Sequence, residues 1–161
     1  RWSWLMTSAI DVICNDEVSP ALFRGLVTWV RAPLDEAAMH IAAQQLLGEN
    51  DFTSYRGAGC QSRSVHRNMQ QIRVWRQGKL VIMEVTANAF LLHMVRNIAG
   101  VLIAVGRGLK PLSWPGELLS LKDRTAGEVT APPDGLYLVA VKYPAALAMP
   151  SAEKGPLFVP D

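Results

Sequence analysis

Cysteine is scarce in this sequence, with only Cys14 and Cys60 among 161 residues. Two such distant residues provide neither a disulfide framework nor the paired spacing of a zinc site. The three histidines are scattered as well, so the sequence predicts no metal site. So few cysteines are typical of the reducing cytoplasm, where we expect this protein to be located.

Long hydrophobic runs are also missing. The longest apolar stretch, residues 90–105, is shorter than a membrane span and includes His93, Arg96 and Asn97. The opening letters, RWSWLMTSA, do not have the pattern of a secretory signal. We therefore expect no membrane association.

Common catalytic signatures are absent too. The chain contains no G-x-S-x-G, P-loop, G-x-G-x-x-G or H-E-x-x-H motif. A cysteine nucleophile paired with His40 or His66 has no local support, because nothing nearby indicates an activated thiolate. The sequence thus provides no standard hydrolase or nucleotide-binding motif.

Acidic residues are almost absent from one long block. Residues 52–110 contain nine lysines and arginines but a single acid, Glu84, whereas the other 102 residues contain seven bases and thirteen acids. A block with net charge +8 favours a polyanionic partner, most simply a nucleic acid. A solvated cationic face is the alternative.

The predicted elements begin with short strands over residues 10–14 and 26–31. A helix follows in PLDEAAMHIAAQQLLGEN, with Asp35 as its N-cap, Ile41 and Leu46 on its apolar face and Gly48 at its end.

Residues 49–68 are polar and irregular, and a hairpin follows over 69–76 and 79–87. Helices are predicted over 89–106 and from a cap at Ser113 to Leu121, and a last strand over 136–144. This order predicts an α+β domain, with a mostly antiparallel sheet and helices packed on one face.

The predicted helix over 89–106 has an unusual polar stripe. His93, Arg96, Asn97 and Gly100 have the spacing of one helix face, and nearly all other positions are apolar. A helix with this pattern is buried on most sides. Because a buried guanidinium is costly unless it is paired, Arg96 needs a partner. Arg96 is then either part of a structural ion pair or held rigid to position a carboxylate or a phosphate. The nearest acid in sequence is Glu84, and no other buried partner is evident.

The irregular loop GENDFTSYRGAGCQSRSVHRN is rich in hydrogen-bonding and basic residues, which suits contact with sugar-phosphate. Arg56, Arg63 and Arg67 are the expected phosphate contacts. Phe52 and Tyr55 either stack on bases or serve as buried anchors of the loop.

Several long motifs now become recognisable: LLGENDFTSYR, CQSRSVHRN, NAFLLHMVRNIAG, KDRTAGEVTAPPDGLYLVAV and GPLF. Together, and in this order, they resemble the C-terminal half of the bacterial tRNA pseudouridine synthase I (A) family. The resemblance extends from about residue 12 to the end of the chain.

This resemblance implies an isomerase that converts uridine to pseudouridine in the tRNA anticodon stem-loop, at tRNA positions 38 to 40. It implies a cytoplasmic homodimer without metal or organic cofactor, in which an aspartate attacks a uridine flipped out of the RNA. By the same resemblance, Arg96 orients that aspartate and Leu136 lines the uracil pocket. Arg56, Arg63, Arg67, His93 and Asn97 are the residues expected to face RNA.

The sequence also departs from the family pattern. The G-R-T-D-x-G-V-H segment that carries the family's aspartate does not occur in it, and Ala9 stands where the family has a stacking tyrosine. We therefore divide the chain into a divergent segment (1–11), which reflects genuine loss or a foreign junction, the synthase domain (12–144) and a Pro-rich tail (145–161). These 161 residues are predicted to be inactive alone. The alternative function is a non-catalytic RNA-binding or dimerisation module.

Overall fold

The computed structural model describes residues 5–143, 156 and 158–159. Within this part the chain forms six strands and three α-helices. In chain order these are β1 (Met6–Asn15), β2 (Thr28–Val30), α1 (Glu36–Ala43), β3 (Gly48–Asp51), β4 (His66–Gln77), β5 (Leu80–Ala87), α2 (Met94–Gly106), α3 (Trp114–Leu121) and β6 (Leu136–Lys142).

All six strands belong to one sheet, in the order β2-β1-β5-β4-β3, with β6 also paired to β1. Strand β1 is antiparallel to β5 on one side. On its other side it pairs first with β6, from Met6 to Asp11, and then with β2, from Ile13 to Asn15. Only the β1–β2 pair is parallel, so the predicted α+β fold with a mostly antiparallel sheet is confirmed.

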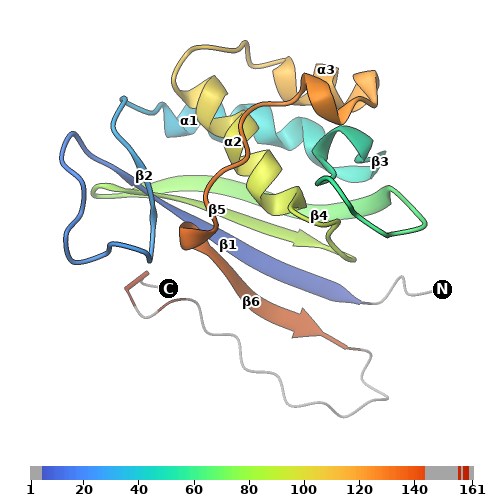
Figure 1. The fold of residues 1–161 in the computed structure, drawn as a ribbon, viewed down its shortest axis with the longest axis horizontal. Helices are drawn as coiled ribbons and strands as arrows, with labels where there is room; N and C mark the ends of the chain where they lie inside the picture. Colours follow the sequence, from blue (N-terminus) through green and yellow to red (C-terminus); the bar gives the residue numbers. More distant parts are fainter. Residues whose placement is uncertain (1–4, 144–155, 157, 160–161) are drawn as a thin grey trace.

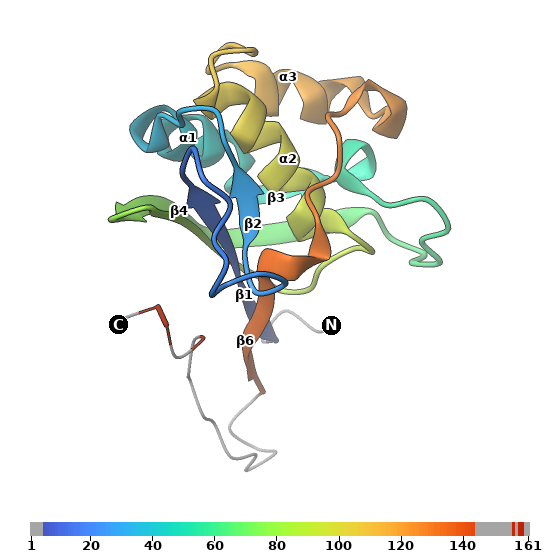
Figure 2. The same cartoon turned by 60° about the vertical axis from the view of Figure 1, so that its left-hand side comes forward.

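The three helices cover one face of this sheet, as both views show (Figures 1 and 2). The main core lies between the two layers, where Ile13 of β1 packs in one cluster with Met94 and Ile98 of α2. A smaller cluster lies on the opposite face, around Val12 and Ile82. The alternation of side chains along β1 therefore sends its odd-numbered residues towards the helices.

Several predicted features are confirmed in detail. Asp35 caps α1, because its Oδ1 accepts a hydrogen bond of 3.0 Å from the backbone N–H of Ala38. The β4–β5 hairpin turns at Gly78, whose φ of 59° suits glycine. No helix in the described ranges is long and apolar enough to cross a membrane.

Other features differ from the prediction. Ile41 is 58% exposed rather than on the apolar face of α1. Leu46 is buried as predicted, and it shares a stripe with Met39, Ala42 and Ala43 at the i, i+3, i+4, i+7 spacing that Ile41 lacks. The polar segment after α1 contains strand β3, which pairs with β4 although its sequence, GEND, has little β propensity.

Helix α2 begins at Met94, five residues later than predicted, because His93 has a left-handed backbone with φ of 59°. The predicted last strand ends at Lys142. Of the predicted tail, 145–161, only Pro156, Phe158 and Val159 lie within the described residues. The centroids of the Phe158 and Phe23 rings lie 5.4 Å apart.

Candidate functional site

The polar stripe of α2 contacts the extended segment 127–132, which runs along the helix towards β6 (Figure 1). The Arg96 Nε donates a hydrogen bond of 2.7 Å to the carbonyl oxygen of Ala131, whose own N–H donates to the Arg96 carbonyl at 3.1 Å. A Cβ on Gly100 would overlap the carbonyl oxygen of Val129. The absence of a side chain at Gly100 is thus what lets this segment approach the helix.

Asn97 ties the stripe to two further segments. Its Nδ2 donates to the carbonyl oxygen of Tyr55 at 2.8 Å, and its Oδ1 accepts from the Thr130 hydroxyl at 2.6 Å. Both polar ends of the amide are therefore used within the chain, and Asn97 fixes the positions of two loops.

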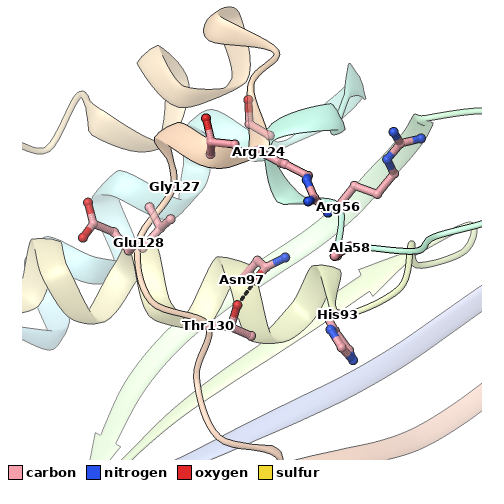
Figure 3. A pocket seen from close by; sticks show the side chains of 12 residues that line it. Arg56, Ala58, His93, Asn97, Arg124, Gly127, Glu128 and Thr130 are labelled. Carbon is pink, nitrogen blue, oxygen red and sulfur yellow. Dashed lines mark hydrogen bonds between the residues drawn. The ribbon is translucent and has the colours of Figure 1, made fainter.

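A cavity of about 330 Å³ opens beside this amide. Its lining comes from the loop after β3, from helix α2 with its N-cap, and from residues 124–130 between α3 and β6. The lining residues are Ser54, Arg56, Gly57, Ala58, His93, Asn97, Val101, Arg124, Thr125, Gly127, Glu128 and Thr130. In Figure 3, Arg56 and Arg124 lie on one side of this basic cavity and Glu128 on the other. Glu128 forms an ion pair of 3.6 Å with Lys110, so the cavity offers two arginines to an anion.

Three of the residues predicted to face RNA meet in the basic cavity: Arg56, His93 and Asn97. Arg124 was not among the predicted contacts, although it stands in the quoted motif KDRT. Only the fold brings this arginine to the same side of the cavity as Arg56.

Arg63 and Arg67 do not line this cavity. Arg63 is exposed on the loop before β4. Arg67 donates to the carbonyl oxygens of Ser64 and His66, at 2.9 and 2.7 Å, and to the Ser62 hydroxyl at 2.9 Å. Arg67 therefore shapes the loop, whereas Arg63 is free to meet a partner.

Phe52 and Tyr55 are the buried anchors of this region, which decides between the two roles considered for them. Both are fully buried, with ring centroids 5.9 Å apart. The Tyr55 hydroxyl donates to the carbonyl oxygen of Pro115 at 2.9 Å. Burial also raises the pKa of the Tyr55 hydroxyl, so this group stays neutral.

The acid nearest to Arg96 in sequence is not its partner in space. Glu84 pairs with Arg73 across the hairpin, at 3.1 Å. The acid whose charge reaches Arg96 is Asp11, in the middle of β1. Burial raises the pKa of Asp11 to about 7, while the positive charge of Arg96 and the nearby Thr28 hydroxyl oppose this rise.

Sequence reasoning missed Asp11 as an acid within range of the Arg96 charge. The signal was present, because an acid within the apolar strand IDVIC has to be buried once both strand faces are covered. Leu136, predicted to line the uracil pocket, is the residue opposite Asp11 in the β1–β6 register. Leu136 is thus paired in register with the acid whose pKa is lowered by the charge of Arg96.

The fold and the site define an α+β domain in which helix α2 and two loops enclose a cavity lined by two arginines. Residues 42–144 match the profile of a family described as tRNA pseudouridine synthase. The chain belongs to this family, and the matched range includes Arg96, Leu136 and the whole basic cavity but not Asp11.

Individual relatives carry the same description. The chain is 52% identical over 160 residues to tRNA pseudouridine synthase A of Coxiella burnetii (strain Dugway 5J108-111), an alignment that covers 99% of this chain and 61% of that protein. It is 50% identical over 150 residues to the protein of that name from Alcanivorax borkumensis, covering 93% of this chain and 56% of that protein. The identity is 53% over 148 residues for Legionella pneumophila (strain Corby), with 92% and 56% covered. The chain thus spans about three fifths of the length of these relatives.

Proposed function

We propose that this chain forms part of an enzyme that isomerises uridine to pseudouridine in the anticodon stem-loop of tRNA, at positions 38 to 40. The observation that carries the proposal is the placement of Arg96. Within the family-matched range, its Nε is fixed by the Ala131 carbonyl. Leu136 is paired in register with Asp11, the acid whose pKa is lowered by the charge of Arg96. A rigid guanidinium beside an apolar side chain can orient a carboxylate against a flat uncharged base.

In this proposal the residues divide into two groups. Arg96 orients the catalytic carboxylate and Leu136 contacts the uracil ring. Arg56, His93 and Asn97, with Arg124 added, contact the RNA from the basic cavity. Arg63 contacts it from the exposed loop, and Arg67 acts by holding that loop in shape.

The synthase domain is proposed to extend over residues 12–144, and these 161 residues are proposed to have no turnover by themselves. Support comes from the sequence, which contains no G-R-T-D-x-G-V-H segment. The test is tritium release from tRNA labelled at uracil C5, measured for the purified chain. Release above the protein-free rate would refute the proposed inactivity, while release by a protein that also contains the aspartate segment would support the proposed reaction.

The setting of the full enzyme is proposed on the family resemblance. It is a cytoplasmic homodimer without metal or organic cofactor, and it acts on tRNA away from membranes. Sedimentation of a protein that contains both halves would test the dimer, and undiminished tritium release after dialysis against EDTA would test the absence of a metal.

A second candidate function is a non-catalytic RNA-binding module. It is favoured by the basic block over residues 52–110 and by the two arginines of the basic cavity. A gel-shift titration of an anticodon stem-loop at 50 and 200 mM salt would test it. Phosphate contacts predict affinity that falls steeply with salt, whereas an inert fragment would not shift the RNA at either concentration.

A further inference from the structure

Asp11 is a buried acid without a hydrogen-bond partner. Its side chain is 0% exposed and lies on the helix-facing side of β1, between Ala9 and Ile13. Neither carboxylate oxygen has a hydrogen bond to a described residue, and no ion pair of 4.0 Å or less involves it. Buried polar groups in folded proteins are nearly always paired, so this one requires an explanation.

Its immediate surroundings leave little room. A Cβ on Gly135 would lie 2.8 Å from the Asp11 Oδ1, so only glycine allows the turn before β6 to cover the carboxylate. Across the neighbouring strands the register partners are apolar, Met83 on β5 and Leu136 on β6. The Thr28 hydroxyl on β2 lies close enough to lower the pKa of Asp11, but without hydrogen-bond geometry, and it too has no partner among the described residues.

Arg96 is the one charged group in the described part of the chain whose field reaches Asp11. Its Nε is engaged by Ala131, while its two Nη groups make no hydrogen bond to a described residue. A guanidinium with free Nη groups and a carboxylate with two free oxygens are complementary in charge and in hydrogen-bonding groups.

We propose that Asp11 is a positioning residue, the internal counter-ion that draws the Arg96 guanidinium towards the centre of β1 until another anion displaces it. The proposal goes beyond the proposed function, and it rests on that function only for the identity of the anion that arrives during the reaction. The family match does not include Asp11, and the resemblance assigns it no role.

The attraction has a defined dependence on pH. It requires the ionised carboxylate, so it is present above the pKa of Asp11 and lost below it. Burial places this transition near neutral pH, at about 7. An anion that competes for Arg96 should therefore bind more weakly at pH 8 than at pH 6.

The first test follows the Asp11 carboxyl carbon by NMR as pH is varied, using the full 161-residue chain. We expect the wild-type protein to titrate near pH 7 and Arg96→Met to move the midpoint upwards, because the lowering effect of the guanidinium is lost. Arg107→Met, an exposed arginine at the C-terminus of the same helix, is the matched control and should leave the midpoint unchanged. A midpoint near pH 4, or one indifferent to Arg96→Met, would overturn the proposal.

A second measurement needs no substitution at Arg96. The Nε resonance of Arg96 in the wild-type protein should change with the same midpoint as Asp11, and Asp11→Asn should abolish this change. If the Arg96 resonance stays constant while Asp11 titrates, the two groups are not coupled and Asp11 does not position the guanidinium.

A competing anion tests the displacement. Sulfate is a suitable probe because its charge is constant between pH 6 and 8. From wild type we expect a severalfold rise in the sulfate Kd measured at Arg96 over this interval, and from Asp11→Asn a clearly smaller rise. Equal rises in both proteins, or no sulfate response of Arg96 in Asp11→Asn, would contradict the proposal. Neither probe involves RNA or turnover, so failure of the proposed function would leave these outcomes unaffected.

Discussion

Burial and backbone contacts give the two cysteines opposite reactivity. Cys14 lies in the sheet with 4% exposure, and burial raises its thiol pKa. Cys60 is partly exposed, and backbone hydrogen bonds with Ser62 and Leu92 lower its thiol pKa. Because the thiolate is the reactive form, the two residues should be distinguishable by alkylation.

We predict that iodoacetamide at pH 7.5 modifies Cys60 in the native chain and reaches Cys14 only in urea. Peptide mass spectrometry would give the two rates. Cys60→Ser serves as the control, because this variant should take up no label when folded and one label when unfolded. Labelling of Cys14 at the rate of Cys60 in the native protein would contradict the burial described for β1.

Asp11 should also make stability depend on pH. Its pKa is about 7 in the folded chain against 3.8 for a solvent-exposed aspartate, so the unfolded chain loses its proton first as pH rises. Stability therefore falls from about pH 4 to pH 7 and then levels off. Between pH 5 and pH 8 this single group should lower the free energy of unfolding by about 3 kcal/mol.

Urea denaturation at the two pH values would measure this loss. In Asp11→Asn the contribution disappears while all other titrating groups remain, so the difference between the two pH values should shrink by that amount. If Asp11→Asn leaves the difference in unfolding free energy between pH 5 and pH 8 unchanged, Asp11 has its ordinary pKa in the folded chain.

At the scale of elements, the contact between α2 and the segment 127–132 determines where Arg96 points. Gly100 permits that contact, because any Cβ there would meet backbone atoms of Val129, which cannot rotate away. The sequence placed Gly100 on the polar stripe correctly, but it could not indicate what the stripe faces. The covering segment, EVTAPP, is far away in the chain and has no periodicity of its own.

We predict that Gly100→Ala destabilises the chain by about 1–3 kcal/mol, because the backbone of 127–132 must move away from α2. Gly116→Ala is the matched control. It too lies in a helix, but its Cβ would meet the end of the Gln45 side chain, which can rotate, and alanine is the better helix former. Thermal unfolding of both variants would decide, and equal losses would show that the backbone contact at Val129 is not specific.

The elements were predictable to different degrees for physical reasons. The β4–β5 hairpin and α1 were predictable from local signals, namely the glycine turn and the Asp35 cap. Strand β3 has no such signal, because its pairing with β4 depends on partners fifteen or more residues away. The late start of α2 depends on the left-handed backbone of His93, whose side chain packs against the distant Gly57.

At the scale of the whole molecule, the candidate site was only partly readable from the sequence. Arg96, Leu136 and the arginine-rich loop could be named from motifs. The motifs did not identify Asp11 or Arg124. Their roles depend on the distant segments that the sheet and the segment before β6 bring close to them. The charge block predicted a basic surface, and it contributes Arg56 to the cavity while Arg124 comes from outside the block.

In an enzyme that contains both this chain and the aspartate segment, we predict that Arg96→Ala abolishes pseudouridine formation and changes tRNA affinity little. Arg63→Ala should weaken tRNA binding severalfold, particularly at low salt, before it affects the chemical step. Tritium release under single-turnover conditions and filter binding would separate the two effects. Near-normal turnover in Arg96→Ala would remove the role proposed for this residue.

Strand β1 is held along both edges, by β5 on one side and by β6 and β2 on the other. Asp11 sits where these pairings meet, under Gly135, and its backbone has no freedom to carry the side chain out to solvent. Strand β1 can therefore respond to acidity by exchanging a proton at Asp11 but not by moving its backbone. Structures determined at pH 5 and pH 9 should superimpose along β1 while differing in the protonation of Asp11.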